Sequence, residues 1–543
     1  MRTTLTFLLL TGAVALSAQA PAAATLAVNR VQATVLNDGR FFTDGQTGQF
    51  IAPYAPGQST PSLLRGAGLW LAGLDPGGNL KMAIATPDAT DFAPGRPSPD
   101  GGSLTDRLGH TIWRVTRAEI DAHRADFADN GKIDNPQPGV FGWPGNDNPF
   151  FAQYNNGNIL PTVDYFLAGY YDSDSDGRYN PGSGDYPALE VRGCPLTQYP
   201  DEMLWYVFND HTANPHPVSG TPALNVEVQV TVFAYQCSEN SPLGNSVFTR
   251  FKVINRGLEN LDNAYFALLN DFIIGDGKQE YAGCDPDRQM AFAYPGNPAQ
   301  GNLPTIGADL MRGPLDALAN PLSLSSMVPF DPAQLASPTA IYNLLKGLNP
   351  DGSPTANNGF PYPDNPLSPN GQSELTAGNT PGNRAVLAAY GPFQLLPGAV
   401  NEIIVAHTFA DNSGLDAAIN NVQPLYRQSD LLQRYFDNCF NAAGATNLCA
   451  RTVLGTSKSE NPDKVLRYFP NPSAGRFVIQ SDGSGIRRVT LYDLLGRAVH
   501  EQRWSAAQNS VELRPEALVP GTYLAQVENE NAQVSVLKIQ VQE

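Results

Sequence analysis

The chain has 543 residues and a formal net charge of −18, with 34 Lys and Arg against 52 Asp and Glu. Such an acidic surface would repel phosphates and therefore excludes nucleic acid as an expected partner. The 50 Gly and 46 Pro stay below the level of low-complexity disorder, so they favour an ordered chain of strands joined by long loops.

Residues 1–24 have the organisation of a secretory signal peptide. A basic residue precedes an apolar run over 5–16, and small residues follow. This run is shorter than the roughly 20 residues that a transmembrane helix needs. Pro21 would hinder cleavage directly before it, so we predict cleavage after Ala22 or Ala24. No other long apolar stretch follows in the sequence, and no transmembrane segment is expected.

The body of the chain, residues 25–450, is predicted to be mainly β, a β-sandwich with long loops and a few short helices. Alternation of apolar and polar residues indicates strands. The longest such run is 225–236, where the valines from Val226 to Val232 face one way and Glu227, Gln229 and Thr231 the other. Further strands are expected at 31–36, 63–72, 80–85, 246–255, 263–274 and 401–409.

Short helices are expected at three places in the body. Thr116 and Glu119 form a capping box that begins a helix reaching about residue 127. A Ser-Pro pair begins a second helix over 337–345, and apolar residues on one face indicate a third over 429–440. Residues 349–383 are rich in Pro, Asn and Gly and are predicted to form a long loop.

The five cysteines of an exported chain favour disulfides over metal thiolates. Cys439 and Cys449 close a short loop, and we predict that they pair. A second bridge could join Cys237 to Cys284, or Cys194 to either of them, and spacing alone does not decide between these pairings.

An Asp-rich loop at 172–185 is the strongest local motif. Gly177 follows three alternate carboxylates, which matches the first half of a calcium loop. Ser183 stands where an EF-hand has its last Glu, so a later Asp is expected to close the shell. The predicted cofactor is a structural Ca²⁺, although an acidic loop built from Asx turns needs no metal. The expected ligands are Asp172, Asp174, Asp176, Asp185 and the backbone carbonyl of Arg178.

Motifs for catalysis are missing from the sequence, and we assign no catalytic residue. It contains no zinc-protease motif, nucleophile elbow or phosphate loop. His211 and His216 are expected to be surface histidines of a Pro-rich loop. A carboxylate pair of a glycosidase forms through space and leaves no such motif. Four tryptophans belong either to the core or to a sugar groove: Trp70, Trp113, Trp143 and Trp205.

The last residues, 464–543, are predicted to form a small immunoglobulin-like β-sandwich. Runs of period two at 489–497, 520–527 and 534–541 stand beside Gly or Pro turns. The polar residues 451–463 before them are predicted to be a linker that a protease can reach. Four side chains are expected to point into one core: Leu491, Leu513, Leu524 and Val536.

This C-terminal region carries a series of short motifs in a fixed order. They are Pro470-Asn471-Pro472, then Tyr492-Asp493-x-x-Gly496-Arg497, then Pro520-Gly521-x-Tyr523, and a final strand with Lys538. The series resembles the type A sorting domain of type IX secretion, with Phe469 where that family usually has Tyr. The resemblance implies export across a Gram-negative outer membrane, contact with the secretion machinery and its sorting-tail peptidase, and then surface attachment or release.

The body also resembles large secreted proteins that carry this same tail, and that resemblance implies an architecture without an activity. We therefore predict a non-catalytic cell-surface or secreted protein with an adhesive or structural role, whose partner could be cell-surface polysaccharide. The alternative is a secreted hydrolase that acts on polysaccharide or peptide. The stretches that carry the likeness are 68–73, 176–179, 184–187, 205–210, 281–285 and 391–393.

Overall fold

The chain forms two compact units, Met1–Ala450 and Arg451–Glu543. We call the first unit the body and the second the tail unit, and each is described by itself. The computed structural model describes residues 21–53, 62–97, 107–161, 167–195, 198–212, 214–237, 241–296, 303–330, 337–411, 422–440, 449, 466–470, 473, 475–481, 485–492, 498–515, 518–530 and 534–542.

Two antiparallel sheets make up most of the body. In the described residues the first sheet has nine strands in the order β1-β2-β3-β5-β14-β19-β18, with β4 beside β2 and β6 beside β5. The strands expected at 63–72 and 80–85 are confirmed as β5 and β6, and β6 pairs with the second half of β5 in a hairpin. Their bounds are β1 Ala23–Leu26, β2 Gln32–Leu36, β3 Arg40–Phe41, β4 Phe50–Ile51, β5 Leu64–Leu74, β6 Leu80–Ile84, β14 Leu261–Phe272, β18 Leu324–Pro329 and β19 Arg384–Leu395.

The second sheet also has nine strands among the described residues, in the order β15-β16-β17-β20-β13-β12-β11-β7, with β8 beside β11. Its central strands β12, β13 and β20 lie where the alternating sequence predicts strands. Their bounds are β7 Ala93–Pro94, β8 Trp113–Thr116, β11 Glu202–Asn209, β12 Val226–Ala234, β13 Ser246–Asn255, β15 Glu280–Asp285, β16 Met290–Pro295, β17 Thr305–Arg312 and β20 Val400–Ala410.

The main core lies between the two sheets, as in a β-sandwich. Val228 and Val230 of β12 are fully buried in the same cluster as Phe266 and Leu268 of β14. Burial of each such side chain contributes about 1.5–3 kcal/mol to stability. The period-two pattern of β12 therefore marks its core face as predicted.

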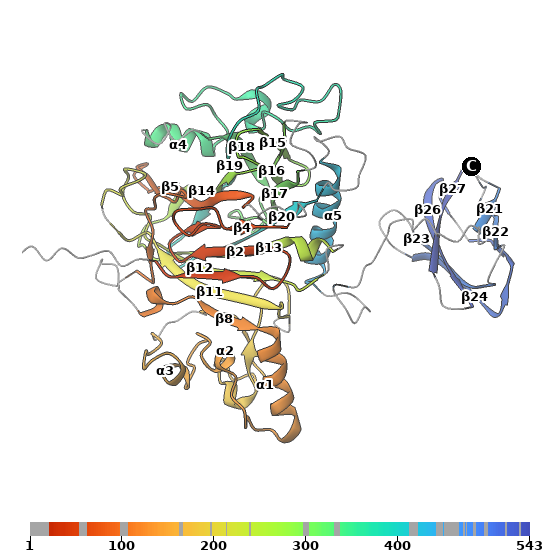
Figure 1. Ribbon diagram of the computed structural model, residues 1–543, viewed down its shortest axis with the longest axis horizontal. Coiled ribbons are helices and arrows are strands. Elements are labelled where there is room, and N and C mark those ends of the chain that lie inside the picture. The colour runs from red at the N-terminus through yellow and green to blue at the C-terminus, as the bar shows by residue number, and fades with distance from the viewer. Residues whose placement is uncertain are drawn as a thin grey trace, which may run out of the picture. The chain divides into compact units, whose positions relative to one another are not determined.

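Helices cover the outer faces of both sheets (Figure 1). α4 (Pro338–Leu345) packs on the first sheet, with Ile341 against the cluster around Trp70. α1 (Arg117–Asn130), α2 (Pro138–Phe141), α3 (Phe151–Tyr154) and α5 (Gln423–Asp437) share a cluster with the outer face of the second sheet. Glu227, which points outward from β12, is also buried, and it forms ion pairs with Arg96 at 3.4 Å and Arg256 at 3.1 Å.

The local signals for the helix ends are confirmed at α1 and α4. Thr116 and Glu119 form the capping box of α1, and Gly131 ends that helix in the left-handed region. α5 begins at Gln423, earlier than the predicted residue 429. Residues 349–383 form the predicted long loop. Within the described residues, the short 3-10 helices are η1 Arg107–His110, η2 Pro181–Ser183, η3 Pro242–Asn245 and η6 Ala356–Gly359.

The tail unit is a small sandwich of two sheets, with the strand orders β21-β22-β25 and β24-β23-β26-β27 in its described part. Leu491 and Leu513 lie in its core as predicted, but Leu524 does not. In β26 the buried side chains are those of Tyr523, Ala525 and Val527. The side chain of Val536 lies outside the described residues. The strands are β21 Leu466–Phe469, β22 Phe477–Ser481, β23 Ile486–Tyr492, β24 Ala498–Gln508, β25 Ser510–Leu513, β26 Gly521–Asn529 and β27 Val534–Val541.

Candidate functional site

The Asp-rich loop connects two short strands, β9 (Tyr170–Tyr171) and β10 (Tyr186–Pro187), which pair with each other. The rings of Tyr171 and Tyr186 stack with their centroids 4.8 Å apart. Tyr179, within the loop, is fully buried, and its hydroxyl donates to the carbonyl of Val140 at 2.7 Å. Both ends of the loop and one point inside it are thus fixed to the body.

Three of the predicted ligands converge at the outer turn of this loop. Asp172, Asp174 and Asp176 each offer a carboxylate oxygen, and these oxygens lie within 4.8 Å of one another. Ser175 and Gly177 both adopt positive φ angles, of 60° and 80°, which fold the alternate side chains to one side. Hard cations such as Ca²⁺ prefer oxygen ligands arranged in this way.

The same carboxylates also accept hydrogen bonds from the backbone of the loop. The N–H of Gly177 donates to Oδ2 of Asp172 at 2.8 Å, and the N–H of Arg178 donates to Oδ1 of Asp176 at 2.8 Å. The bond from Arg178 to Asp176 is that of an Asx turn, the bond from Gly177 to Asp172 spans five residues, and both preform the bend. A carboxylate has further lone pairs, so such bonds leave acceptor capacity for a cation.

Asp185, expected as a further calcium ligand, does not lie with the other three carboxylates. It is fully buried, its Oδ1 accepts from the N–H of Ser173 at 2.8 Å, and its Oδ2 accepts from the N–H of Asn180 at 2.8 Å. Among the described residues it does not belong to the group of converging carboxylates. Burial raises the pKa of Asp185, while these bonds lower it. Asp185 therefore closes the loop as a hydrogen-bond acceptor.

The predicted disulfide between Cys439 and Cys449 is wrong. Cys439 pairs with Cys194 and Cys449 pairs with Cys237, with Cα atoms 5.6 and 5.0 Å apart. Cys284 is a free, buried thiol, so its proposed pairing with Cys237 or Cys194 is also wrong. Cysteines close in sequence were expected to pair, but the fold brings both Cys439 and Cys449 against segments more than 200 residues earlier.

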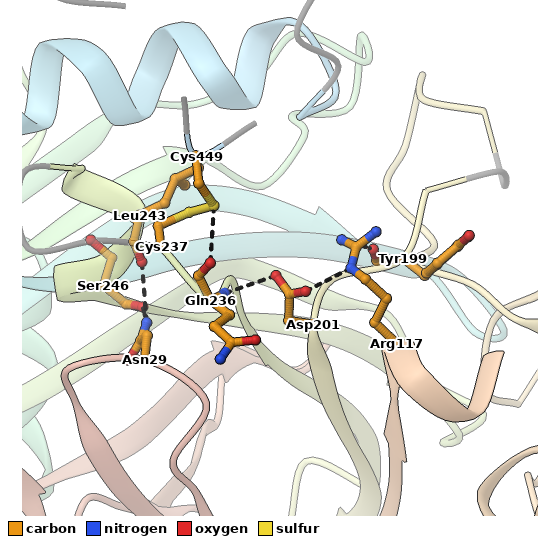
Figure 2. The surroundings of a disulfide bond; sticks show 9 residues. All are labelled: Asn29, Arg117, Tyr199, Asp201, Gln236, Cys237, Leu243, Ser246 and Cys449. Atoms are coloured by element: carbon orange, nitrogen blue, oxygen red, sulfur yellow. Dashed lines mark hydrogen bonds and ion pairs between the residues drawn. A yellow bond between two sulfur atoms is a disulfide. The ribbon is translucent and has the colours of Figure 1, made fainter. Parts of the chain in front are cut away.

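The Cys237–Cys449 disulfide fixes the chain just before the tail unit begins (Figure 2). Sγ of Cys449 lies 3.1 Å from the carbonyl oxygen of Gln236. The N–H of Gln236 donates to Asp201 at 2.8 Å, and the other oxygen of Asp201 accepts from Nε of Arg117 at 2.7 Å. Cys449 is thus tied to the end of β12 and to the first turn of α1.

The loop before β13 is held beside this disulfide (Figure 2). The side-chain amide of Asn29 donates to the carbonyls of Leu243 and Ser246 at 3.1 and 2.9 Å. These bonds join the beginning of the body to the segment that precedes β13. The surroundings of the disulfide therefore combine early, middle and late segments of the body.

The prediction that His216 lies on the surface is wrong. It is buried, and its ring nitrogens lie 2.7 Å from the carbonyl oxygens of Met82 and Asp210. Its role is to hold a loop against β6. His211 is half-buried, and Asp210 next to it is fully buried. The four tryptophans, Trp70, Trp113, Trp143 and Trp205, are all buried, which settles their place in the core.

The described part of the sorting motif lies on the strands of the tail unit. Pro470 follows β21, Pro520 precedes β26, Gly521 begins it, and Lys538 lies in β27. The hydroxyl of Tyr523 donates to the carbonyl of Val519 at 2.8 Å, and that of Tyr492 donates to Gln526 at 3.0 Å. The remaining motif residues lie outside the described residues: Asn471, Pro472, Asp493, Gly496 and Arg497.

Comparison with known families decides the identity of this unit. Residues 467–542 match the family described as "Secretion system C-terminal sorting domain". The tail unit is a type IX secretion sorting domain. The sorting domain directs the chain to the cell surface or the extracellular space and implies interaction with the secretion machinery.

Comparisons of the whole chain give little more. No curated protein matches it. One solved structure that is similar to it is a polysaccharide lyase, 8% identical, with a match covering 70% of this chain, 40% of the lyase and a TM-score of 0.21. This chain thus spans less than half of the lyase. In the described residues no helix is long and apolar enough to cross a membrane.

An open pocket that the sequence did not predict lies at the end of β15. Its volume is about 470 Å³, and its lining includes Asp285, Asp287, Asp364 and Tyr426. Asp285 is tied to Arg288 by an ion pair of 2.7 Å. Asp285 and Asp287 are neighbours in the sequence, but no local spacing links them to residues 364 and 426, which join them only through the fold.

Proposed function

We propose that the exported chain is a non-catalytic, calcium-stabilised β-sandwich protein with an adhesive or structural role at the cell surface or outside the cell. Its signal peptide is removed on export, and the sorting-tail peptidase cuts in the predicted linker, residues 451–463. The linker and most of the signal peptide lie outside the described residues. Cell-surface polysaccharide is the partner that fits such a role.

The calcium part depends on one observation, the convergence of Asp172, Asp174 and Asp176 within 4.8 Å. These three carboxylates would hold the ion, and the carbonyl of Arg178 and water would add to the 6–8 oxygens that Ca²⁺ usually takes. Bound Ca²⁺ supplies charge neutralisation where three like charges meet. Asp185 keeps the loop closed from its buried position.

Thermal unfolding of the full chain tests the calcium proposal. A concentration of Ca²⁺ about tenfold above the Kd adds about 1.4 kcal/mol, and for a chain of this length the melting temperature should then rise by about 1–2 °C relative to chelator. The double variant Asp174→Asn, Asp176→Asn should lose this rise. Asp129→Asn is the matched control, because it removes an exposed carboxylate from α1. Equal melting temperatures with Ca²⁺ and with chelator would reject the proposal.

A secreted hydrolase acting on polysaccharide or peptide is the second candidate, and the open pocket favours it. Asp287 and Asp364 are exposed carboxylates beside the ring of Tyr426, which is the composition of many saccharide sites. Under this candidate, the full chain releases reducing ends or peptides from a polymer, and Asp287→Asn with Asp364→Asn reduces the rate at least about a hundredfold. Unchanged turnover in that variant would reject the pocket as an active site.

A further inference from the structure

A cluster of charged side chains lies on the outer face of the second sheet, away from the Asp-rich loop and the open pocket. β13 and β20 contribute its centre. A register shift in β17 after Leu310 places Arg312 beside them. The segment after β10 completes it. The members are Glu190, Arg192, Arg250, Lys252, Arg312 and Glu402.

The two carboxylates of this cluster are engaged by its deepest cations. Nε of Arg250 donates to Glu402 at 2.7 Å, and its Nη2 lies 3.1 Å from Glu190. Nζ of Lys252 lies 3.5 Å from the same oxygen of Glu190. Arg250 and Glu402 are buried, so their pairing is needed to offset the loss of hydration.

The two outer guanidiniums, of Arg192 and Arg312, are less closely paired with the carboxylates. In the described part of the chain, Arg192 has no ion pair within 4.0 Å, and its guanidinium contacts only the carbonyl of Gly313 at 3.4 Å. Arg312 contacts the carbonyl of Arg192 and lies 3.7 Å from Glu402. Burial lowers the pKa of Arg192, the negative charge of Glu402 raises it, and the positive charges of Arg312 and Arg250 lower it.

The cluster therefore has four cations and two carboxylates, within a chain whose net charge is −18. Two excess positive charges on a half-buried surface are costly unless an anion shares the site. Planar guanidiniums bind oxyanions through paired N–H donors. We propose that Arg192 and Arg312 bind a small oxyanion, such as a carboxylate, sulfate or phosphate group.

The site is rigid on both sides, which favours binding because little ordering is required. Arg192 is two residues from Cys194, whose disulfide to Cys439 joins it to the end of α5. The guanidinium of Arg312 lies over the ring of Phe436 at 5.0 Å. A long polyanion would be repelled by the acidic chain as a whole, so a small anion or a single acidic group fits better.

Calorimetric titration of the full chain with sodium sulfate and sodium phosphate, at constant ionic strength, tests this proposal. The wild type should bind at millimolar concentration or below, and Arg192→Gln or Arg312→Gln should weaken binding at least about tenfold. Arg192→Lys keeps the charge but loses the paired donors, so it should bind at an intermediate level. Lys278→Gln, which removes an exposed charge elsewhere, should bind like the wild type.

The anion could belong to an acidic saccharide or be a free small anion. Acetate and galacturonate distinguish these two sources, because both carry one carboxylate but only galacturonate is a sugar. Galacturonate binding at least about tenfold tighter than acetate assigns the site to acidic saccharide, and equal binding assigns it to free small anions. The proposal is rejected if the wild type binds none of the four anions at millimolar concentration. It is equally rejected if a folded Arg192→Gln variant, checked by its circular dichroism, binds them as the wild type does.

Discussion

The Asp-rich loop and the charged cluster around Arg250 differ in the solvent exposure of their charged groups. In the loop, Asp174 and Asp176 are exposed, and water screens the repulsion between them. In the cluster, Arg250 and Glu402 are buried, with side-chain exposures of 4% and 6%. Like charges can therefore gather in the loop at little cost, whereas each charge in the cluster requires a partner.

Because of this difference, the charges of the loop are available to bind a cation, whereas those of the cluster contribute to folding stability. An exposed loop can gain or lose a cation without disturbing the sheets, because its carboxylates are not needed for packing. The buried pair of Arg250 and Glu402 joins β13 to β20 at the middle of the second sheet. Substitutions in the two regions should consequently differ by several kcal/mol in their effect on folding.

The largest effect is expected for Arg250→Leu. This change leaves the buried Glu402 and the half-buried Glu190 without their closest cation, and it should lower the free energy of unfolding by about 3–5 kcal/mol. Urea unfolding of the full chain measures it. Arg434→Leu removes an exposed guanidinium from α5 and should cost less than about 1 kcal/mol. Equal losses in the two variants would contradict the contrast drawn between buried and exposed charge.

Sequence patterns predicted the parts of the fold that depend on neighbours along the chain. The capping box of Thr116 and Glu119 and the alternation in β12 depend on spacings of two or three residues, and both are confirmed. The Asp-rich loop was found for the same reason. The alternation in β26 was visible too, but the sequence did not show which face is buried, and Leu524 was placed wrongly.

The features that the sequence did not reveal are those assembled by the topology. Arg250 meets Glu402 because β13 pairs with β20, 152 residues away in the sequence. The same holds for the two disulfides, whose partners are 245 and 212 residues apart. No local spacing encodes such contacts, so a search of one sequence for motifs cannot find them.

An intermediate, pH-dependent effect is expected for Asp309→Asn. Burial raises the pKa of Asp309 in β17 from 3.8 to about 7. The folded carboxyl thus holds its proton more tightly than the unfolded one, and its contribution to stability falls as the pH rises from about 4 to about 7. Asparagine cannot ionise, so the variant should gain about 2–3 kcal/mol on the wild type between pH 5 and pH 8.

Urea unfolding of both proteins at the two pH values measures this gain, because titration of all other groups cancels in the difference. Asp129→Asn is the control, since an exposed carboxylate should give a difference that does not change with pH. A stability difference between Asp309→Asn and the wild type that is the same at pH 5 and pH 8 would mean that Asp309 titrates normally.

The smallest effect is expected for Asp174→Asn in the presence of chelator. Asp174 is exposed, and the hydrogen bond that it accepts from the N–H of Asp176 at 3.3 Å can be kept by the amide oxygen of the Asn. Loss of one of three like charges should slightly favour the folded loop, so the free energy of unfolding should change by less than about 0.5 kcal/mol. Asp185→Ala in the same loop removes a buried acceptor and should cost about 1–3 kcal/mol. A loss at Asp174 as large as that at Asp185 would mean that the exposed carboxylate holds the loop together without any metal, and would favour the Asx-turn interpretation over the calcium site.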